Sequence, residues 1–324
     1  MRRRTFHGAL CATVLVHAGL VHADEKWPSK PVKVVLSQPA GSGPDTVARL
    51  LCDGLARARG QAFVIENKPG GQNVIGAQAV ARSPADGYTL YFSTAAALVT
   101  NSYLFKTLPY DPLRDFAPVS FVADSPFAIF VKADSPIATL QDLVVRSQKD
   151  PGKLSIANEG PRTFGGMIAR VVNARSKAQA NLVSYSSVGM ALQDIMGGHA
   201  DAVVADVASS SQFARQGRLR MLAVTSAKRL SSWQQVPTVS EFLPGIEMSG
   251  WMAMVAPAAT PPTIVSRLNA EVTRLLGDPA LREKILGVGP IASVGGSPKE
   301  FETFLQEEHR RLGKIAGEIG LLPE

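Results

Sequence analysis

The sequence predicts an α/β protein of two lobes with a cleft between them. Its 324 residues, 45% hydrophobic and 19% charged, have an ordinary globular composition and suffice for two hydrophobic cores. Short β-branched runs alternate with amphipathic helical patterns between residues 32 and 224. Such alternation is typical of a mostly parallel sheet covered by helices on both faces.

The first 23 residues have the pattern of a secretory signal peptide. Three arginines precede an apolar run from about Gly8 to Val21, and small residues occupy the positions that cleavage after Ala23 requires. The run is shorter than the ~20 residues of a membrane-spanning helix. The sequence around Cys11 does not fit a lipoprotein signal. We therefore expect a protein secreted across the inner membrane, with its signal peptide cleaved near Ala23.

Loss of the signal peptide also changes the charge. The mature chain keeps 31 basic and 27 acidic residues, so its net charge is +4 in place of +7. The basic residues are interspersed with acids and form no stripe with stacking aromatics, so we expect no nucleic-acid partner. A mild positive charge helps to gather small anions.

The first predicted lobe opens with repeated strand, glycine turn and helix. Leucines and valines at helical spacing follow the turn at Gly41, and Gly60 ends that helix. The predicted strands here are residues 32–36, 63–65 and 88–92. One predicted helix follows the glycine turn and ends at residue 60, and a second spans residues 74–82.

The second lobe repeats the alternation. Thr139 and Asp142 have the spacing of a capping box at the start of a helix. The predicted strands, after an apolar segment at 116–122, are residues 127–131, 154–156, 182–183, 202–205 and 219–224, and the predicted helices are 139–146, one from Phe164 and 189–196.

From Pro257 the chain is mainly helical, and the apolar faces of these helices need a sheet to pack against. Ser297, Pro298 and Glu300 form an N-cap, a first-turn proline and a capping glutamate for the last helix. The economical arrangement returns this part to the first lobe. We therefore expect a discontinuous domain 1 of residues 24–125 and 229–324 and a domain 2 of residues 126–228, with a ligand cleft between them.

Few residues could support catalysis or hold a metal. Three of the five histidines lie in the signal peptide, which leaves His199, expected in a turn, and His309, expected to be solvated on the last helix. Only Cys52 survives in the mature chain, so no intramolecular disulfide is possible, and we expect it to be a buried small hydrophobe. No metal motif is present, and we expect neither metal nor cofactor.

The glycine turn at residues 41–43 fails three tests. It lacks the Lys-Ser/Thr pair of a phosphate-binding loop, the third glycine of a dinucleotide fingerprint and the GxSxG pattern of a nucleophile elbow. What remains is a strand, a glycine turn and a helix, whose N-terminal N–H groups and dipole attract anions. Similar turns recur at 69–71 and 160–163. We expect Asp45 to cap the helix and Ser42 to be free to donate a hydrogen bond.

Several short motifs resemble the Bug-type solute-binding proteins of the tripartite tricarboxylate transporter family. They are spread over the mature chain, and together they are specific. They are WPSKP at 27–31, PAGSGPD at 39–45, ENKPG at 66–70, ADGYTL at 85–90, LPYDP at 108–112, DFAPV at 115–119, LAVT at 222–225, VPTV at 236–239, and Trp251 with Ala256 and Pro257.

This resemblance implies the type II periplasmic binding protein fold and a receptor that is not an enzyme. Such a receptor closes two lobes on a small organic acid, a carboxylate or an amino acid, and delivers it to the membrane components of a transporter. We expect a monomer. One alternative is a sensor that signals to a membrane two-component kinase, and a more distant one is a secreted serine hydrolase that uses Ser42.

The resemblance also implies which residues bind the ligand. The first lobe would contribute Ser37, Gln38, Pro39, Ala40, Gly41, Ser42, Gly43, Gly71, Gln72, Asn73, Val74, Ser93 and Thr94. The second lobe would contribute Gly160, Arg162, Thr163, Phe164, Tyr185, Ser186 and Asp206.

This chain departs from the family pattern at three of these places. Gln72 and Asn73 replace a glycine pair, so their amides could contact the ligand or narrow the pocket. Arg162 stands where the family commonly has glycine, and residues 184–187 lack the family's lysine. We hypothesise that Arg162 supplies the positive charge for a distal carboxylate. The alternative is a solvated loop arginine.

Overall fold

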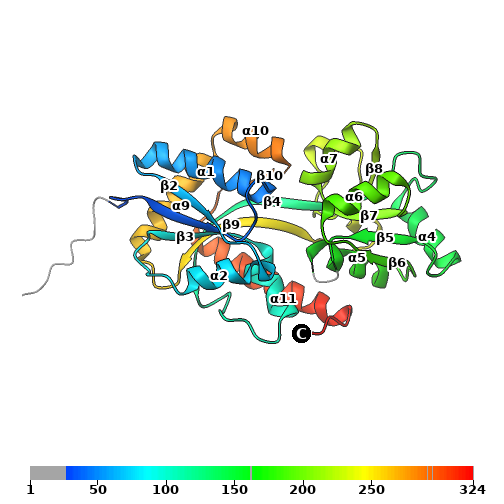
Figure 1. Ribbon diagram of the computed structural model, residues 1–324, viewed down its shortest axis with the longest axis horizontal. Helices are drawn as coiled ribbons and strands as arrows, with labels where there is room; N and C mark the ends of the chain where they lie inside the picture. Colours follow the sequence, from blue (N-terminus) through cyan, green and yellow to red (C-terminus); the bar gives the residue numbers. More distant parts are fainter. Residues whose placement is uncertain (1–26, 161–162, 290, 294, 324) are drawn as a thin grey trace, which may run out of the picture.

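The computed structural model describes residues 27–160, 163–289, 291–293 and 295–323. Two α/β groups lie side by side, joined by the long strands β4 (Phe116–Lys132) and β9 (Ser249–Pro257) (Figure 1). The signal peptide predicted at residues 1–23 lies outside the described part. Within that part, no helix is both long and apolar enough to cross a membrane.

The first group combines N-terminal and C-terminal segments. The N-terminal segments are β1 (Val32–Leu36), α1 (Gly43–Arg59), β2 (Phe63–Asn67), a 3-10 turn η1 (Gly71–Asn73), α2 (Val74–Ala81), β3 (Thr89–Thr94), a π-helical turn η2 (Ala96–Thr100) and α3 (Asn101–Leu104). The C-terminal segments are α9 (Pro262–Leu276), α10 (Pro279–Val288), β10 (Ile291–Ala292) and α11 (Pro298–Glu318).

The second group is formed by the middle of the chain. Its elements are α4 (Leu140–Lys149), β5 (Ser155–Asn158), α5 (Phe164–Arg175), β6 (Asn181–Ser184), α6 (Val188–Gly197), β7 (Ala202–Asp206), α7 (Val207–Arg215) and β8 (Leu219–Val224). A 3-10 turn η3 (Ser231–Trp233) and the short helix α8 (Val239–Phe242) follow, before the chain returns along β9 (Ser249–Pro257).

The strand order corrects one expectation. It reads β2-β1-β3-β9-β4-β7-β5-β6, with β8 and β10 also paired to β4. Pairing is parallel among β1, β2 and β3 and among β5, β6 and β7, but antiparallel at β3–β9, β4–β9, β4–β7 and β4–β8. The predicted mostly parallel sheet is therefore wrong at the centre, because the chain leaves the first group along β4 and returns along β9.

Strand β4 (Phe116–Lys132) is a single strand of 17 residues, where the sequence predicted two short segments. It pairs with β9 from Phe116 opposite Pro257 to Pro126 opposite Ser249. It then continues into the second group, where Phe127 lies opposite Asp206 of β7. One strand thus passes through both groups, and β9, which was not predicted, lies beside it.

Helix ends follow the local signals of the sequence. Helix α1 ends at Gly60, which takes the left-handed conformation with φ 67°. Capping boxes begin α4, at Thr139 and Asp142, and α11, at Ser297 and Glu300. These predicted ends are confirmed.

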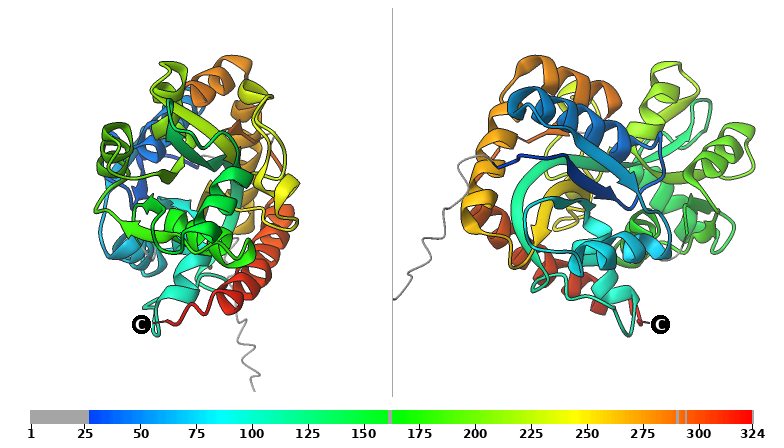
Figure 2. Two further views of the ribbon diagram at one scale, coloured as in Figure 1. Left: turned by 90° about the vertical axis from the view of Figure 1, so that its right-hand side faces the viewer. Right: turned by 60° about the vertical axis from the view of Figure 1, so that its left-hand side comes forward.

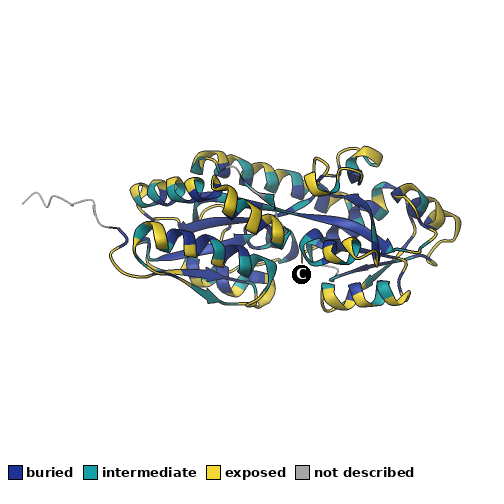
Figure 3. Cartoon of the chain, turned by 90° about the horizontal axis from the view of Figure 1, so that it is seen from above, coloured by how far each residue is buried: buried dark blue, intermediate teal, exposed yellow. Residues whose placement is uncertain are grey.

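Helices cover both faces of the sheet and leave the strands in the interior (Figures 2 and 3). Leu268 and Val272 of α9 share one core with Val119 and Val122 of β4. On the opposite side, Phe301 of α11 packs in a second core that includes Tyr91 and Val255. Cys52 is buried, as predicted, and burial raises the pKa of its thiol to about 12.

Candidate functional site

A cavity of about 620 Å³ lies between the two groups, beside the crossing strands. This volume is in the range typical of small-molecule sites. The lining draws on both groups and on β4 and β9. It comprises Gln38, Gly41, Ser42, Gly43, Pro44, Thr46, Thr94, Ala95, Ala96, Ser125, Phe127, Phe164, Val188, Asp206, Ala208, Ser209, Gly250, Trp251, Met252 and Val288.

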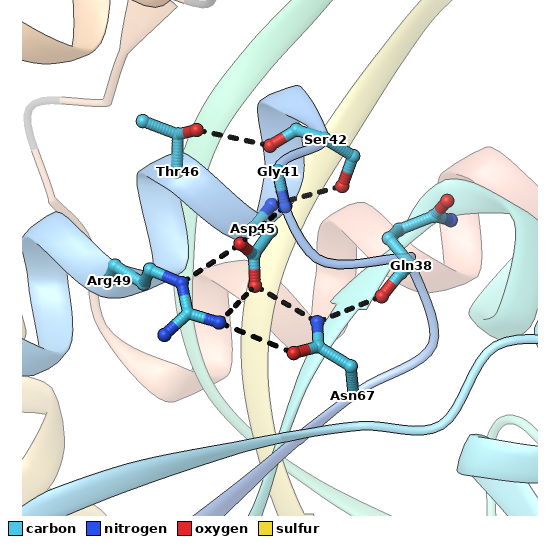
Figure 4. Close-up of polar contacts among 7 residues, drawn as sticks. All are labelled: Gln38, Gly41, Ser42, Asp45, Thr46, Arg49 and Asn67. Atoms are coloured by element: carbon cyan, nitrogen blue, oxygen red, sulfur yellow. Dashed lines mark hydrogen bonds and ion pairs between the residues drawn. The ribbon is translucent and has the colours of Figure 1, made fainter.

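The loop between β1 and α1 forms one wall and is held in place by Asp45 (Figure 4). The carboxylate of Asp45 accepts hydrogen bonds from the Gly41 N–H at 2.9 Å, from Arg49 Nε at 2.9 Å and from Asn67 Nδ2 at 2.9 Å. Asn67 Nδ2 also donates to the carbonyl oxygen of Gln38 at 2.9 Å. One buried carboxylate therefore connects the loop, the helix and the end of β2.

This network corrects the predicted helix cap. Ser42 is the N-cap of α1, because its Oγ accepts from the Asp45 N–H at 3.4 Å, and Asp45 is the third helical residue. Burial alone would raise the pKa of Asp45, but hydrogen bonds from Arg49, Asn67 and Gly41 hold it below its usual value. Asp45 is thus a fixed anion behind the loop, and Ser42 rather than Asp45 caps the helix.

The first turns of four helices border the cavity. Gly43 begins α1, Phe164 begins α5, Val188 begins α6, and Ala208 and Ser209 belong to the first turn of α7. The caps of the three helices in the second group are Thr163, Ser187 and Asp206. First-turn N–H groups lack partners within their helix, and the positive ends of the helix dipoles point toward the same space. The cavity is therefore suited to an anion.

The cavity brings together part of the predicted set of site residues. Gln38, Gly41, Ser42, Gly43, Thr94, Phe164 and Asp206 line it. Ser37, Pro39, Ala40, Gly71, Gln72, Asn73, Val74, Ser93, Gly160, Thr163, Tyr185 and Ser186 are not among the lining residues. Arg162 lies outside the described residues. Ligand contact by any of these positions stays a prediction.

Of these non-lining residues, Asn73 contacts a residue that lines the cavity, whereas Ser37 and Tyr185 bond to residues outside the lining. Asn73 Oδ1 accepts from Gln38 Nε2 at 2.7 Å, so the loop containing Gln72 and Asn73 touches the wall without forming it. Ser37 Oγ lies 2.7 Å from Tyr91 Oη, deep behind the loop. Tyr185 Oη donates to Asp194 Oδ2 at 2.7 Å.

In the second group, the turn before α5 carries an acid that the sequence analysis missed. Glu159 Oε1 accepts from the Gly165 N–H at 3.4 Å, in the turn closed by Thr163. Burial, together with the negative charge of Asp206, raises the pKa of Glu159 to about 7. Asp206 caps α7, with Oδ1 accepting from the Ser209 N–H at 2.8 Å. Neither spacing nor motif marked Glu159, because its neighbour Asp206 is distant in sequence.

Sequence reasoning also missed most of the apolar lining. Phe127 comes from β4, Trp251 and Met252 from β9, and Val288 from the end of α10. From the sequence alone, these apolar residues cannot be distinguished from residues of the hydrophobic core. The available signal was Trp251, which belongs to one of the motifs shared with the Bug-type proteins.

The polar residues at the site do not form a catalytic set. His199 is an exposed turn residue, as predicted. His309 is not solvated as expected: its Nε2 lies 2.6 Å from the Leu98 carbonyl oxygen, and burial lowers its pKa. His309 lies on α11. Ser42, the residue that a serine hydrolase would use, is the N-cap of α1. Among the described residues, no group of three or more potential ligands could hold a metal.

Comparisons with known proteins agree with this geometry. The family model for the tripartite tricarboxylate transporter family receptor matches residues 47–321. Protein BugT of Bordetella pertussis is 30% identical over 305 residues, which cover 94% of this chain and 93% of BugT.

Two solved structures add the fold. That of R. palustris Rpa4515 with adipate is 31% identical, with a TM-score of 0.82 over 92% of this chain and 100% of that chain. That of MatC from Rhodopseudomonas palustris with bound malate is 27% identical, with a TM-score of 0.77 over 90% of this chain and 100% of that chain. The chain belongs to the tripartite tricarboxylate transporter receptor family, whose Bug-type members are periplasmic solute-binding proteins of this two-lobed α/β fold and not enzymes.

Proposed function

We propose that this protein captures a small organic carboxylate between its two lobes and delivers it to the membrane components of a tripartite tricarboxylate-type transporter. The observation that carries the proposal is the convergence of four helix N-termini on one cavity. The relatives solved with adipate and with malate support a carboxylate as the ligand.

The clearest candidate for contact with the carboxylate is the start of α1. Gly43 lines the cavity directly after the cap, and the next residue, Pro44, has no N–H to offer. The Gly43 N–H is therefore the first-turn donor nearest the cap, and the absence of a side chain leaves its backbone accessible. Gly41, with φ 82°, supplies the turn that aims it.

The remaining parts of the proposal follow from the sequence. Residues 1–23 would be removed on export to the periplasm, and the mature chain would act as a monomer. The domain division at residues 125/126 and 228/229 stays a prediction. The first boundary falls inside β4, along which the chain leaves the first group. The second falls between β8 and η3, ahead of the return along β9, although Leu230 and Val236 still pack in the core of the second group.

Substitution of Gly43 by Ala tests the contact. A Cβ on Gly43 would have its nearest neighbour, Val288 Cγ1, at 4.0 Å, so the fold accepts the methyl group while the ligand meets it. We expect a loss of carboxylate affinity of at least tenfold, measured by isothermal titration calorimetry on the mature chain after an organic-acid screen.

The matched control is Gly317→Ala on α11, where a Cβ meets nothing within 4 Å and no cavity lining is changed. It should bind like the wild type. Equal carboxylate affinity of Gly43→Ala and Gly317→Ala would show that the start of α1 does not contact the ligand. If the protein bound uncharged compounds and no carboxylate, the proposed function would be wrong.

A further inference from the structure

Apart from the loop at residues 41–43, much of the cavity lining is apolar, and we call this part the apolar wall. Its large side chains come from the crossing strands and from helix ends of both groups. They are Phe127, Phe164, Val188, Trp251, Met252 and Val288.

The aromatic side chains on this wall are closely packed. The Phe127 and Phe164 rings lie with centroids 5.4 Å apart at 56°. A Cβ on Gly250 would lie 3.3 Å from Phe127 Cε2, and one on Gly165 would lie 3.4 Å from Phe127 Cε1. Gly250 and Gly165 thus leave room for the Phe127 ring, which a side chain at either position would crowd.

Trp251 is equally confined. It is 2% exposed, and its ring contacts Phe304 at 5.5 Å and Phe301 at 6.1 Å between centroids, from the side of α11. Preorganised apolar surface of this kind lowers the entropy cost of binding a flat apolar group. Aromatic rings pair with one another by offset or edge-to-face contact.

The charges on this wall disfavour a second carboxylate. Among the described lining residues the one ionisable side chain is Asp206, and none is Lys or Arg. A second carboxylate beside Asp206 would approach a like charge that no lysine or arginine among the described lining residues offsets. Uncharged apolar groups carry no such cost.

We propose that the ligand is a monocarboxylate with an aromatic ring, whose carboxylate meets the start of α1 and whose ring lies against Phe127, Phe164 and Trp251. This inference rests on the proposed function and specifies the class of acid. It makes Phe164, which is half-buried at the start of α5, a specificity-determining residue.

A ligand series titrated into the mature chain by calorimetry tests the proposal. The series compares 3-phenylpropionate and benzoate with butyrate, succinate and adipate. We expect the phenyl acids to bind at least tenfold more tightly than either dicarboxylate. Tighter binding of succinate or adipate would overturn this inference and leave the proposed function standing. Failure of every acid would count against the proposed function itself.

Two variants separate recognition of the ring from general damage. Phe164→Leu should weaken 3-phenylpropionate about tenfold and change butyrate less than twofold, whereas a merely structural defect would weaken both. Phe213→Leu, the same change on a half-buried side chain of α7 outside the cavity lining, is the control.

Arg162→Ala should change 3-phenylpropionate affinity less than threefold. A loss above tenfold would mean that the cation of Arg162 dominates recognition and would overturn the proposal.

Discussion

At the scale of single residues, two carboxylates near the cavity have opposite electrostatic settings. Asp45 is buried but receives hydrogen bonds from Arg49, Asn67 and Gly41, and its pKa is lowered. Glu159 is half-buried beside the negative charge of Asp206 with few donors, and its pKa is raised to about 7. Asp45 is therefore ionised and holds the loop at residues 41–43 in place, whereas Glu159 is close to half-protonated at neutral pH.

The raised pKa of Glu159 predicts a pH dependence of stability. In the unfolded chain Glu159 ionises near its ordinary value of 4.5, whereas in the folded chain it ionises near 7. The folded state therefore binds the extra proton, and stability is lost as the pH rises from about 4.5 through 7.

Glu159→Gln should remove this dependence. We expect the variant and the wild type to unfold alike near pH 4.5, and the variant to be more stable at pH 8 by at most about 3 kcal/mol. Urea unfolding followed across this pH range measures the difference. Glu283→Gln, at an exposed position of α10, is the control and should parallel the wild type. Parallel curves for Glu159→Gln would show that Glu159 is ordinary in the folded protein.

At the scale of elements, the start of α1 has two roles that can be separated. Ser42 caps the helix through its Oγ, and the same turn faces the cavity. Loss of an N-cap side chain costs about 1 kcal/mol, and Asp or Asn restores a cap. Asp, however, adds a negative charge where the proposed ligand brings its own.

Three substitutions of Ser42 therefore give a distinct pattern. Ser42→Ala should lower the free energy of unfolding by about 1 kcal/mol. Ser42→Asp should restore the stability but lose carboxylate affinity at least tenfold, and Ser42→Asn should keep both closer to the wild type. Calorimetry and urea unfolding give the two readouts. If Ser42→Asp bound carboxylates as well as Ser42→Asn, the ligand's charge would not lie near this turn.

At the scale of the whole molecule, α10 of the first group meets α7 of the second at the edge of the cavity. Any side chain at Gly289, the residue that ends α10, would overlap the backbone of Ala208. Ala208 also lines the cavity, so this contact closes one side of it. A ligand that binds both groups stabilises the arrangement in which the two helices touch.

Gly289→Ala should therefore oppose closure. We expect weaker ligand binding and a smaller ligand-induced decrease in the radius of gyration, measured by small-angle X-ray scattering with and without 3-phenylpropionate. Gly60→Ala is the matched control: it also ends a helix with positive φ, but a Cβ there meets nothing within 4 Å. The same compaction in both variants would show that closure does not need the contact of α10 with α7.

Prediction succeeded where the signal is local. Residues 32–36 read as a strand and form β1, and the capping pairs Thr139–Asp142 and Ser297–Glu300 begin helices as expected. The glycine turn at 41–43 was placed at the site because its residue types have a local meaning. The cap itself was assigned to Asp45 instead of Ser42, since both are good capping residues and only the backbone decides between them.

By itself, the sequence determined the strand and helix alternation, the family, and the loop before α1, because each depends on residues that are neighbours in the chain. The tertiary structure alone decided that β4 is one strand through both groups, that β9 runs beside it, and that Phe127, Phe164 and Trp251 share one wall. Those features depend on contacts between distant segments. An apolar residue reads the same in sequence whether it fills a core or faces a ligand.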